Sequence, residues 1–173
     1  MQPPYRDVVH ALRRAFSSPA PRLKPPSIWG TGPRSWGALT PEEIVAIDGY
    51  VQAQAIQHCH PRIVRAMRIQ WEEDAVMAAH AVQAQVDTMD KALPPEMLAQ
   101  WMQKWARRRL FDIPVWPYTK WAQVTGIDRG AISQTRRELC DGLTRSLNDG
   151  IRIMQPVLWD AGLVSNLIDR ACG

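Results

Sequence analysis

The stretch WAQVTGIDRGAISQTRR, residues 121–137, predicts two helices joined by a tight turn. Such a unit needs a small residue where the helices cross and a glycine at the turn, where the backbone takes a left-handed conformation. Ala122 and Gly126 meet these two requirements, and Asp128 is a suitable N-cap for the second helix. The pattern therefore predicts a helix-turn-helix from Tyr118 to Arg137, within residues 117–147.

Apolar residues of this unit are expected to bury the junction between its helices: Trp121, Ile127 and Ile132. Thr125 and Thr135 depart from the pattern, because apolar residues are usual at both positions. Beyond the turn, a stripe with four-residue spacing predicts that the second helix continues with one face in the core: Leu139, Leu143, Leu147 and Ile151.

The polar residues of the same unit form the pattern of a DNA-binding surface: Thr119, Lys120, Arg129, Ser133, Gln134, Arg136 and Arg137. Recognition helices place donors near their N-terminus, where they reach base edges and phosphates in the major groove. We expect Arg129 to pair with a guanine, and Ser133 and Gln134 to reach base edges. The two arginines that end the unit suit phosphates, as do the polar residues of the first helix. The alternative interpretation is a helical hairpin with a solvated basic face.

The rest of the chain shows helical periodicity and no hairpin-forming strands, which predicts an all-α helical bundle with the helix-turn-helix near the C-terminal end. A short amphipathic helix is expected from Asp7 to Phe16. Thr40 opens a capping box with a proline at the first helical position. Further helical segments are expected at residues 40–60, at 62–91 with a break near 72–74, and from residue 96.

Residues 1–39 are basic and rich in proline, and we expect them to form an arm with a short helix before a helical domain at residues 40–173. Because proline fixes φ and removes a backbone donor, the part after the short helix is expected to be extended. Its cationic and aromatic residues are candidates for contact with a partner: Arg22, Lys24, Trp29, Arg34 and Trp36. Alternatively, the two tryptophans cover the core where the arm docks.

The net charge of +4 is unevenly distributed along the 173 residues. Residues 1–39 and 100–150 are basic and residues 40–99 are acidic, so two surfaces can face a polyanion while the middle meets another partner. The three cysteines are far apart, which favours a reducing cytoplasm over a disulfide framework. No apolar run is long enough to span a membrane, and the N-terminus lacks the features of a secretory signal.

Other chemistry has little support in the sequence. His58-Cys59-His60 lacks the paired spacing of structural zinc sites, so we expect no metal there, and Cys59 and Ile56 are expected in the core. The acidic run at residues 72–74 is expected to be a solvated face and not a two-metal site. Without a glycine-rich phosphate loop or a nucleophile elbow, we expect neither an enzyme nor a bound cofactor. Tryptophans that could stack on single-stranded bases are expected in the core instead: Trp71, Trp101, Trp105 and Trp121.

Two stretches, LPPEMLAQWMQKW (93–105) and YTKWAQVTGIDRGAISQTRRELCDGL (118–143), resemble the region of sigma factors that reads the −35 promoter element. More specifically, residues 28–147 resemble phage late-gene antitermination proteins of the Q type. The resemblance rests on two Trp-Gly pairs, at 29–30 and 36–37, and on the pattern Ile47-Asp48-x-x-Val51.

This resemblance implies a DNA-binding transcription regulator acting in the cytoplasm of a bacterial host. Such a protein binds double-stranded DNA beside a late promoter and is loaded onto paused RNA polymerase. It stays attached and narrows the RNA exit path, so that elongation passes terminators. The resemblance further implies that the basic arm contacts RNA polymerase or nascent RNA, and that the acidic middle contacts polymerase.

Two alternatives use the same motif differently. A small terminase subunit would mark viral DNA for packaging, but such proteins usually carry the motif at the N-terminus. A simple repressor or activator would need a dimerisation helix, for which residues 151–171 are the candidate.

Overall fold

The structure, a computed structural model, describes residues 3–18, 39–113 and 115–165, and every regular element in these ranges is an α-helix. The all-α class expected from the sequence is confirmed. The elements are α1 (Val8–Ser17), α2 (Pro41–His58), α3 (Pro61–Trp71), α4 (Ala75–Val86), α5 (Pro95–Ala106), α6 (Tyr118–Thr125) and α7 (Arg129–Asp160). Extended residues at the two ends of the described chain meet in one isolated bridge, Tyr5 to Val164.

Helices α1, α2 and α4 each begin at a residue whose side chain caps the helix. The Thr40 hydroxyl accepts a hydrogen bond from the Glu43 backbone N–H, and the Glu43 carboxylate accepts one from the Thr40 N–H, which confirms the capping box. Asp7 caps α1 by accepting from the His10 N–H at 2.7 Å. Asp74 caps α4 by accepting from two backbone N–H groups, so the break expected at residues 72–74 is also confirmed.

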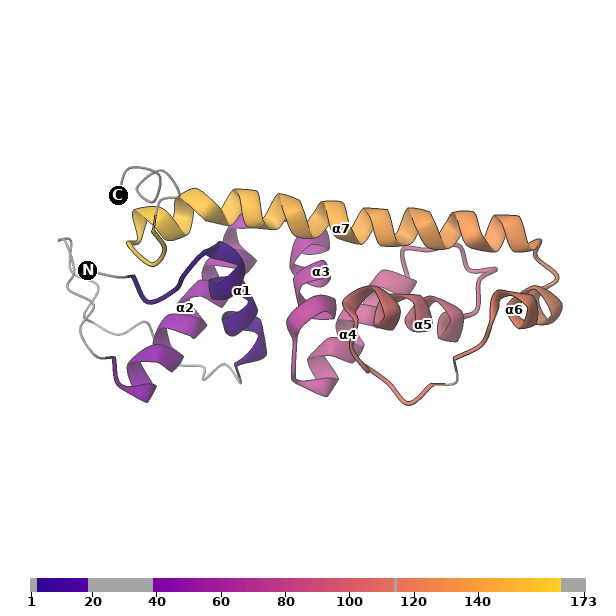
Figure 1. Ribbon diagram of the computed structural model, residues 1–173, viewed down its shortest axis with the longest axis horizontal. Coiled ribbons are helices and arrows are strands. Elements are labelled where there is room, and N and C mark those ends of the chain that lie inside the picture. The colour runs from indigo at the N-terminus through magenta and orange to yellow at the C-terminus, as the bar shows by residue number, and fades with distance from the viewer. Residues whose placement is uncertain (1–2, 19–38, 114, 166–173) are drawn as a thin grey trace.

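Helix α7 is in contact with both ends of the molecule, because its 32 residues run along the full length of the bundle (Figure 1). At a rise of about 1.5 Å per residue, a helix of this length measures about 48 Å. The C-terminal half of α7 packs in one apolar core with α1, α2 and α3. Its N-terminal half packs in a second core with α3 to α6. Helices α3 and α7 therefore belong to both cores.

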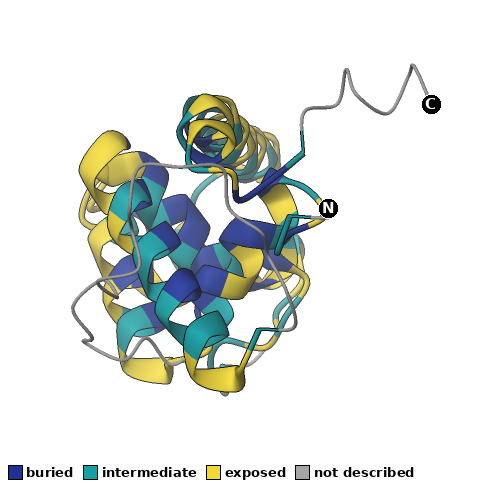
Figure 2. Ribbon diagram, turned by 90° about the vertical axis from the view of Figure 1, so that its left-hand side faces the viewer, coloured by how far each residue is buried: buried dark blue, intermediate teal, exposed yellow. Residues whose placement is uncertain are grey.

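The inner face of α7 is buried along both halves, and its outer face is open to solvent (Figure 2). Leu139 and Leu143 of the predicted stripe are buried, and Leu147 and Ile151 pack against the core. Further along, Met154 and Leu158 are fully buried within the chain's own core. The segment that a repressor would need for dimerisation thus makes intramolecular contacts as far as Val164.

A glycine permits the close crossing of α3 and α7. A Cβ atom built on Gly150 would lie 2.3 Å from Met67 Cε and 2.6 Å from Ile63 Cγ2, which is too close for real atoms. In the first core, the Asp48 side chain joins two helices through polar contacts. Its buried carboxylate accepts from the Tyr5 hydroxyl at 2.6 Å and from Arg14 at 3.2 Å, and so joins α1 to α2.

Two expectations about burial were wrong. Of the acidic run at residues 72–74, Glu73 and Asp74 are exposed as expected, but Glu72 is 7% exposed, because the end of α3 turns it inward beside Arg108. The Arg108 guanidinium donates to the backbone oxygens of three residues at the end of α3 and thereby caps that helix: Arg68, Ile69 and Glu72. Ile56 was expected in the core with Cys59, but it is 49% exposed because it lines an open groove near the end of α2.

The tryptophans expected in the core divide into two groups. Trp101 and Trp121 are buried, as expected. Trp71 and Trp105 are partly buried at the edges of the two cores, and the Trp105 indole N–H donates to the Thr144 hydroxyl at 2.9 Å.

Candidate nucleic-acid interface

Helices α6 and α7 are joined by a turn of three residues, and we call residues 118–137 the α6–α7 unit. Gly126 ends α6 with φ of 70°, a left-handed conformation that glycine adopts without the steric cost of a side chain. Asp128 then caps α7 by accepting from the Gly130 N–H at 2.7 Å and the Ala131 N–H at 3.3 Å. The backbone thus takes the conformation that the sequence pattern predicts for this turn.

The inner side of the unit is apolar. Trp121 is 3% exposed and Ile132 is fully buried, so the two helices share the second core. Thr125 and Thr135 fit in place of apolar residues because their hydroxyls donate to backbone carbonyls one turn earlier, at 2.8 and 2.9 Å. Ile127, the remaining expected junction residue, is partly buried against the same core.

Arg136 is half-buried between the two helices of the unit. Its guanidinium donates to the Tyr118 hydroxyl and lies 5.8 Å from the centre of the Tyr118 ring. This contact ties the second turn of α7 to the first residue of α6. The arginine that the sequence assigns to a phosphate therefore holds the two helices together.

A buried glutamine connects the unit to the rest of the bundle. Gln100 of α5 is 1% exposed, and its side-chain oxygen accepts from the Trp116 N–H at 3.0 Å and from the Trp121 indole at 3.1 Å. Its amide nitrogen donates to the Trp116 carbonyl at 2.9 Å. One turn later, Gln103 accepts from the Leu110 and Phe111 N–H groups at 2.7 and 2.5 Å.

These glutamines were missed in the sequence, where both stand among apolar residues on an otherwise ordinary helix. The only signal available was a pair of amides three residues apart on a helix rich in tryptophan and methionine. They fix the connector between α5 and α6, so the orientation of the unit follows that of α5.

The outer side of the unit carries the cationic residues. Arg129 and Arg137 of α7 are exposed, as are Thr119 and Lys120 of α6. The Lys120 ammonium lies 3.9 Å from the centre of the Trp116 ring, which holds it at the surface by a cation–π contact.

Acidic residues limit this basic surface on the side toward the middle of α7. Gln134 is exposed and its amide donates to Glu138 at 2.8 Å, so it must leave this carboxylate to reach a base. Asp141 is exposed one turn beyond Arg137, while Ser133 is partly buried. Positive charge on α7 is thus concentrated in its first two to three turns.

The remaining candidate residues do not add to the site. The five arm residues predicted to contact a partner (Arg22, Lys24, Trp29, Arg34 and Trp36) lie outside the described residues. His58 contacts Gln54, and His60 caps α3 by accepting from the Arg62 N–H. Within the described ranges, no group of three His, Cys, Asp or Glu side chains is arranged to hold a metal ion. No helix among the described residues combines the length and apolarity required to cross a bilayer.

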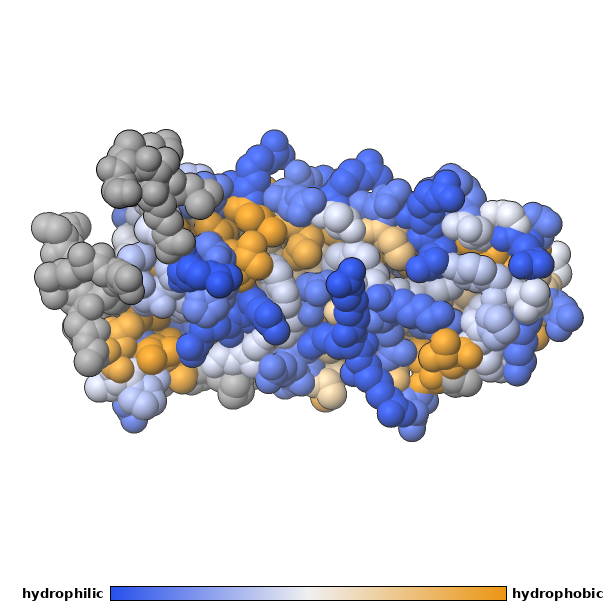
Figure 3. All heavy atoms as spheres, in the orientation of Figure 1, coloured by the Kyte–Doolittle hydropathy of each residue, from blue (hydrophilic) through white to orange (hydrophobic). Residues whose placement is uncertain are grey.

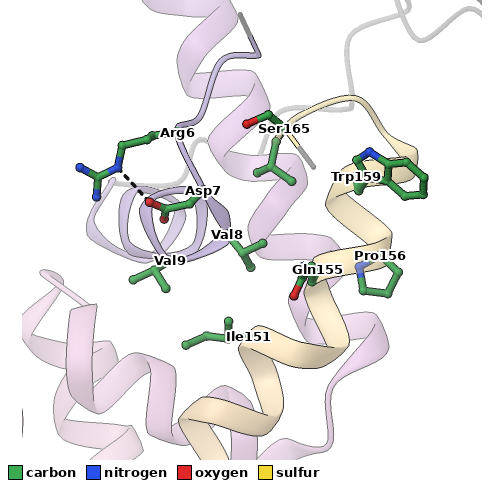
Figure 4. A pocket seen from close by; sticks show the side chains of 10 residues that line it. Arg6, Asp7, Val8, Val9, Ile151, Gln155, Pro156, Trp159 and Ser165 are labelled. Carbon is green, nitrogen blue, oxygen red and sulfur yellow. Dashed lines mark hydrogen bonds and ion pairs between the residues drawn. The ribbon is translucent and has the colours of Figure 1, made fainter. Parts of the chain in front are cut away.

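A groove of about 410 Å³ lies at the opposite end of the molecule from α6, between α1 and the C-terminal half of α7. Val8 and Val9 of α1 extend toward Ile151 of α7, and Trp159 lies on the outer side of the groove (Figure 4). The space-filling view shows apolar side chains gathered where these two helices meet on an otherwise largely hydrophilic face (Figure 3). The groove offers apolar contact and a single charged pair, Arg6 with Asp7 at 2.9 Å.

No protein-family model, curated protein or solved structure matches the chain.

Proposed function

We propose that the chain binds double-stranded DNA through the α6–α7 unit, with the first turns of α7 in the major groove. The observation that carries the proposal is the geometry of the turn, where a left-handed glycine and a capping aspartate set the start of α7 against a buried inner face. This arrangement leaves Arg129 at the N-terminus of α7 and Arg137 two turns later, both exposed. Recognition helices present base-reading donors at these places.

The contacts of the candidate residues support a division of roles among them. Arg129 is the best placed to read a base, with Ser133 and Gln134 beside it. Arg137 replaces Arg136 as the main phosphate contact on α7, because the Arg136 guanidinium is bonded to Tyr118. Lys120 supplies the phosphate contact from α6.

The test begins with selection of preferred duplexes from a random pool by the full-length protein, followed by titration of the selected and random duplexes. Arg129→Gln is expected to cost about 1–3 kcal/mol on the selected duplex and little on random DNA. Arg137→Gln is expected to weaken both and to reduce the salt slope by about one. Arg152→Gln is the matched control, since this exposed arginine lies on α7 far from α6.

Wild-type protein that binds duplex DNA no better than the double variant Arg129→Gln, Arg137→Gln would refute the proposal. An equal loss from Arg129→Gln on selected and random duplexes would remove the base-reading role alone.

On the resemblance to Q-type proteins, we propose that this DNA binding loads the chain onto RNA polymerase beside a late promoter, as an antiterminator. A transcription assay with purified polymerase tests this step. Read-through of distant terminators that requires both the promoter-proximal DNA and Arg129 is the expected result. Tight DNA binding without read-through would leave a DNA-binding regulator or a packaging module.

A further inference from the structure

A second groove, of about 420 Å³, lies between the end of α2, the outer side of α3 and α4. We call it the α3–α4 groove. Its apolar lining comes mainly from Ile56 of α2, Val64 of α3, and Ala81 and Ala84 of α4. Ile56 is 49% exposed, which leaves a hydrophobic edge of the groove open to solvent.

The charged side chains of the α3–α4 groove have one sign. Helix α3 contains three arginines at three-residue spacing and no acidic residue. Two of them, Arg65 and Arg68, line the groove together with His80, and no aspartate or glutamate is among its described lining residues. These cationic side chains lie within residues 40–99, which carry an excess of acidic residues overall.

The two arginines lack carboxylate partners. Among the described residues, neither Arg65 nor Arg68 forms an ion pair. The Nη1 of Arg65 donates to the Ala84 carbonyl. The Nη1 of Arg68 contacts the Met77 sulfur at 3.7 Å, and its Nε is buried with no hydrogen-bond partner in the described part of the chain.

Glu72 does not serve as a carboxylate partner for these two arginines in the groove. Glu72, one turn after Arg68, interacts with it electrostatically but is buried at the end of α3 and does not line the groove. Because no carboxylate of the described residues pairs with Arg65 or Arg68, an incoming carboxylate would accept charge-assisted hydrogen bonds from their Nη groups.

We propose that the α3–α4 groove binds an acidic amphipathic segment of a partner protein, with an apolar side chain packed on Ile56 and Val64 and a carboxylate on Arg65 and Arg68. Helix-in-groove recognition combines such an apolar anchor with complementary charge. A nucleic acid fits less well, because the lining is mostly apolar and two arginines provide few phosphate contacts. This surface is separate from the α6–α7 unit and does not depend on DNA binding.

The test titrates the full-length protein with a labelled peptide of about 12 residues, enough for three helical turns, in which leucines four positions apart alternate with aspartate and glutamate. Saturable binding is expected, and it should weaken when ionic strength rises from about 0.1 M to about 1 M. Ile56→Ser and Arg65→Gln should each reduce affinity about tenfold. The controls are Val76→Ser and Arg62→Gln, which change an exposed valine of α4 and the neighbouring arginine of α3 outside the groove and should leave affinity unchanged.

Three results would overturn the proposal. The first is no binding at about 1 mM peptide, near the limit of specific recognition. The second is equal binding of a peptide in which lysines replace the acids, which would show apolar adhesion without charge recognition. The third is full competition by a single-stranded oligonucleotide together with loss of oligonucleotide binding in Arg65→Gln, which would make the groove a nucleic-acid site.

Discussion

The sequence identifies the residues of the candidate site but does not give the role of each one, as Arg136 shows. Its spacing from Gly126 predicts a place on the second helix of the unit, and it lies on α7. Its contact with Tyr118 spans eighteen residues and depends on the angle at which α6 and α7 cross, which no local pattern encodes. The residues whose roles depend on one helix alone, such as the cap Asp128, are those that sequence reasoning assigned correctly.

Replacement of Arg136 is expected to lower the stability of the fold. Arg136→Gln should lower the free energy of unfolding by about 1–2 kcal/mol, because it removes a charge-assisted hydrogen bond and a cation–π contact. Tyr118→Phe should cost less, since the ring remains. Urea unfolding checks both, with Arg137→Gln as a surface control expected within about 0.5 kcal/mol of wild type. A loss for Arg136→Gln no larger than the control's would contradict the structural role.

Glu72 is expected to give the chain a specific pH dependence. Burial raises the pKa of its carboxyl above the usual value, and the positive charges of Arg68 and Arg108 oppose this only in part. The folded state therefore holds the proton more tightly than the unfolded state. The resulting stabilisation is complete below the ordinary carboxyl pKa and is lost as the pH rises through the raised one.

Glu72→Gln keeps the neutral form at every pH. Its unfolding free energy should exceed that of the wild type at pH 7, and the difference should vanish as the pH falls below the ordinary carboxyl pKa. Urea titrations across this range measure the difference, with exposed Glu73→Gln as the control. A variant that is less stable than wild type at pH 7 would show that pairing with the arginines outweighs the burial.

At the scale of whole elements, the sequence predicts where helices begin better than what they contact. Caps are local, so the starts of α2 and α4 and the break between α3 and α4 followed from a few adjacent residues. The ties between elements are not local. Gln100 and Arg108 act on backbone groups 16 to 40 residues away, and their roles became visible only in the assembled bundle.

Two glycines of α7 provide a matched test of helix packing. Gly150→Ala should destabilise the fold by about 1–3 kcal/mol, because the added methyl would overlap the buried Ile63 and Met67 side chains. Gly142→Ala meets no atom within 4 Å and should stabilise the helix by about 0.5–1 kcal/mol. Thermal and urea unfolding of both variants measure the contrast. Similar effects of the same sign would show that α3 and α7 do not cross closely at Gly150.

At the scale of the whole molecule, the two apolar cores are coupled through α3 and α7. A proline at Arg145 would interrupt α7 near the boundary between them by removing the N–H that bonds one turn back, at a cost of about 3 kcal/mol. In Arg145→Pro, hydrogen exchange is expected to become faster in the helices of one core than in the helices of the other core. Arg145→Ala should retain a single cooperative transition, because this side chain is exposed. Equal protection of α1 and α5 from hydrogen exchange in Arg145→Pro would show that the coupling of the two cores does not depend on an unbroken α7.

The continuity of α7 also restricts how the length of such a chain can vary. Each residue inserted into a helix advances everything beyond it by about 1.5 Å and turns it by about 100°. An insertion between residues 137 and 150 would therefore rotate the exposed arginines of the α6–α7 unit relative to the α1 end of the bundle, unless Gly150 moved away from α3. Homologous chains are expected to place their gaps in the loop at residues 87–94, and to keep α7 at constant length.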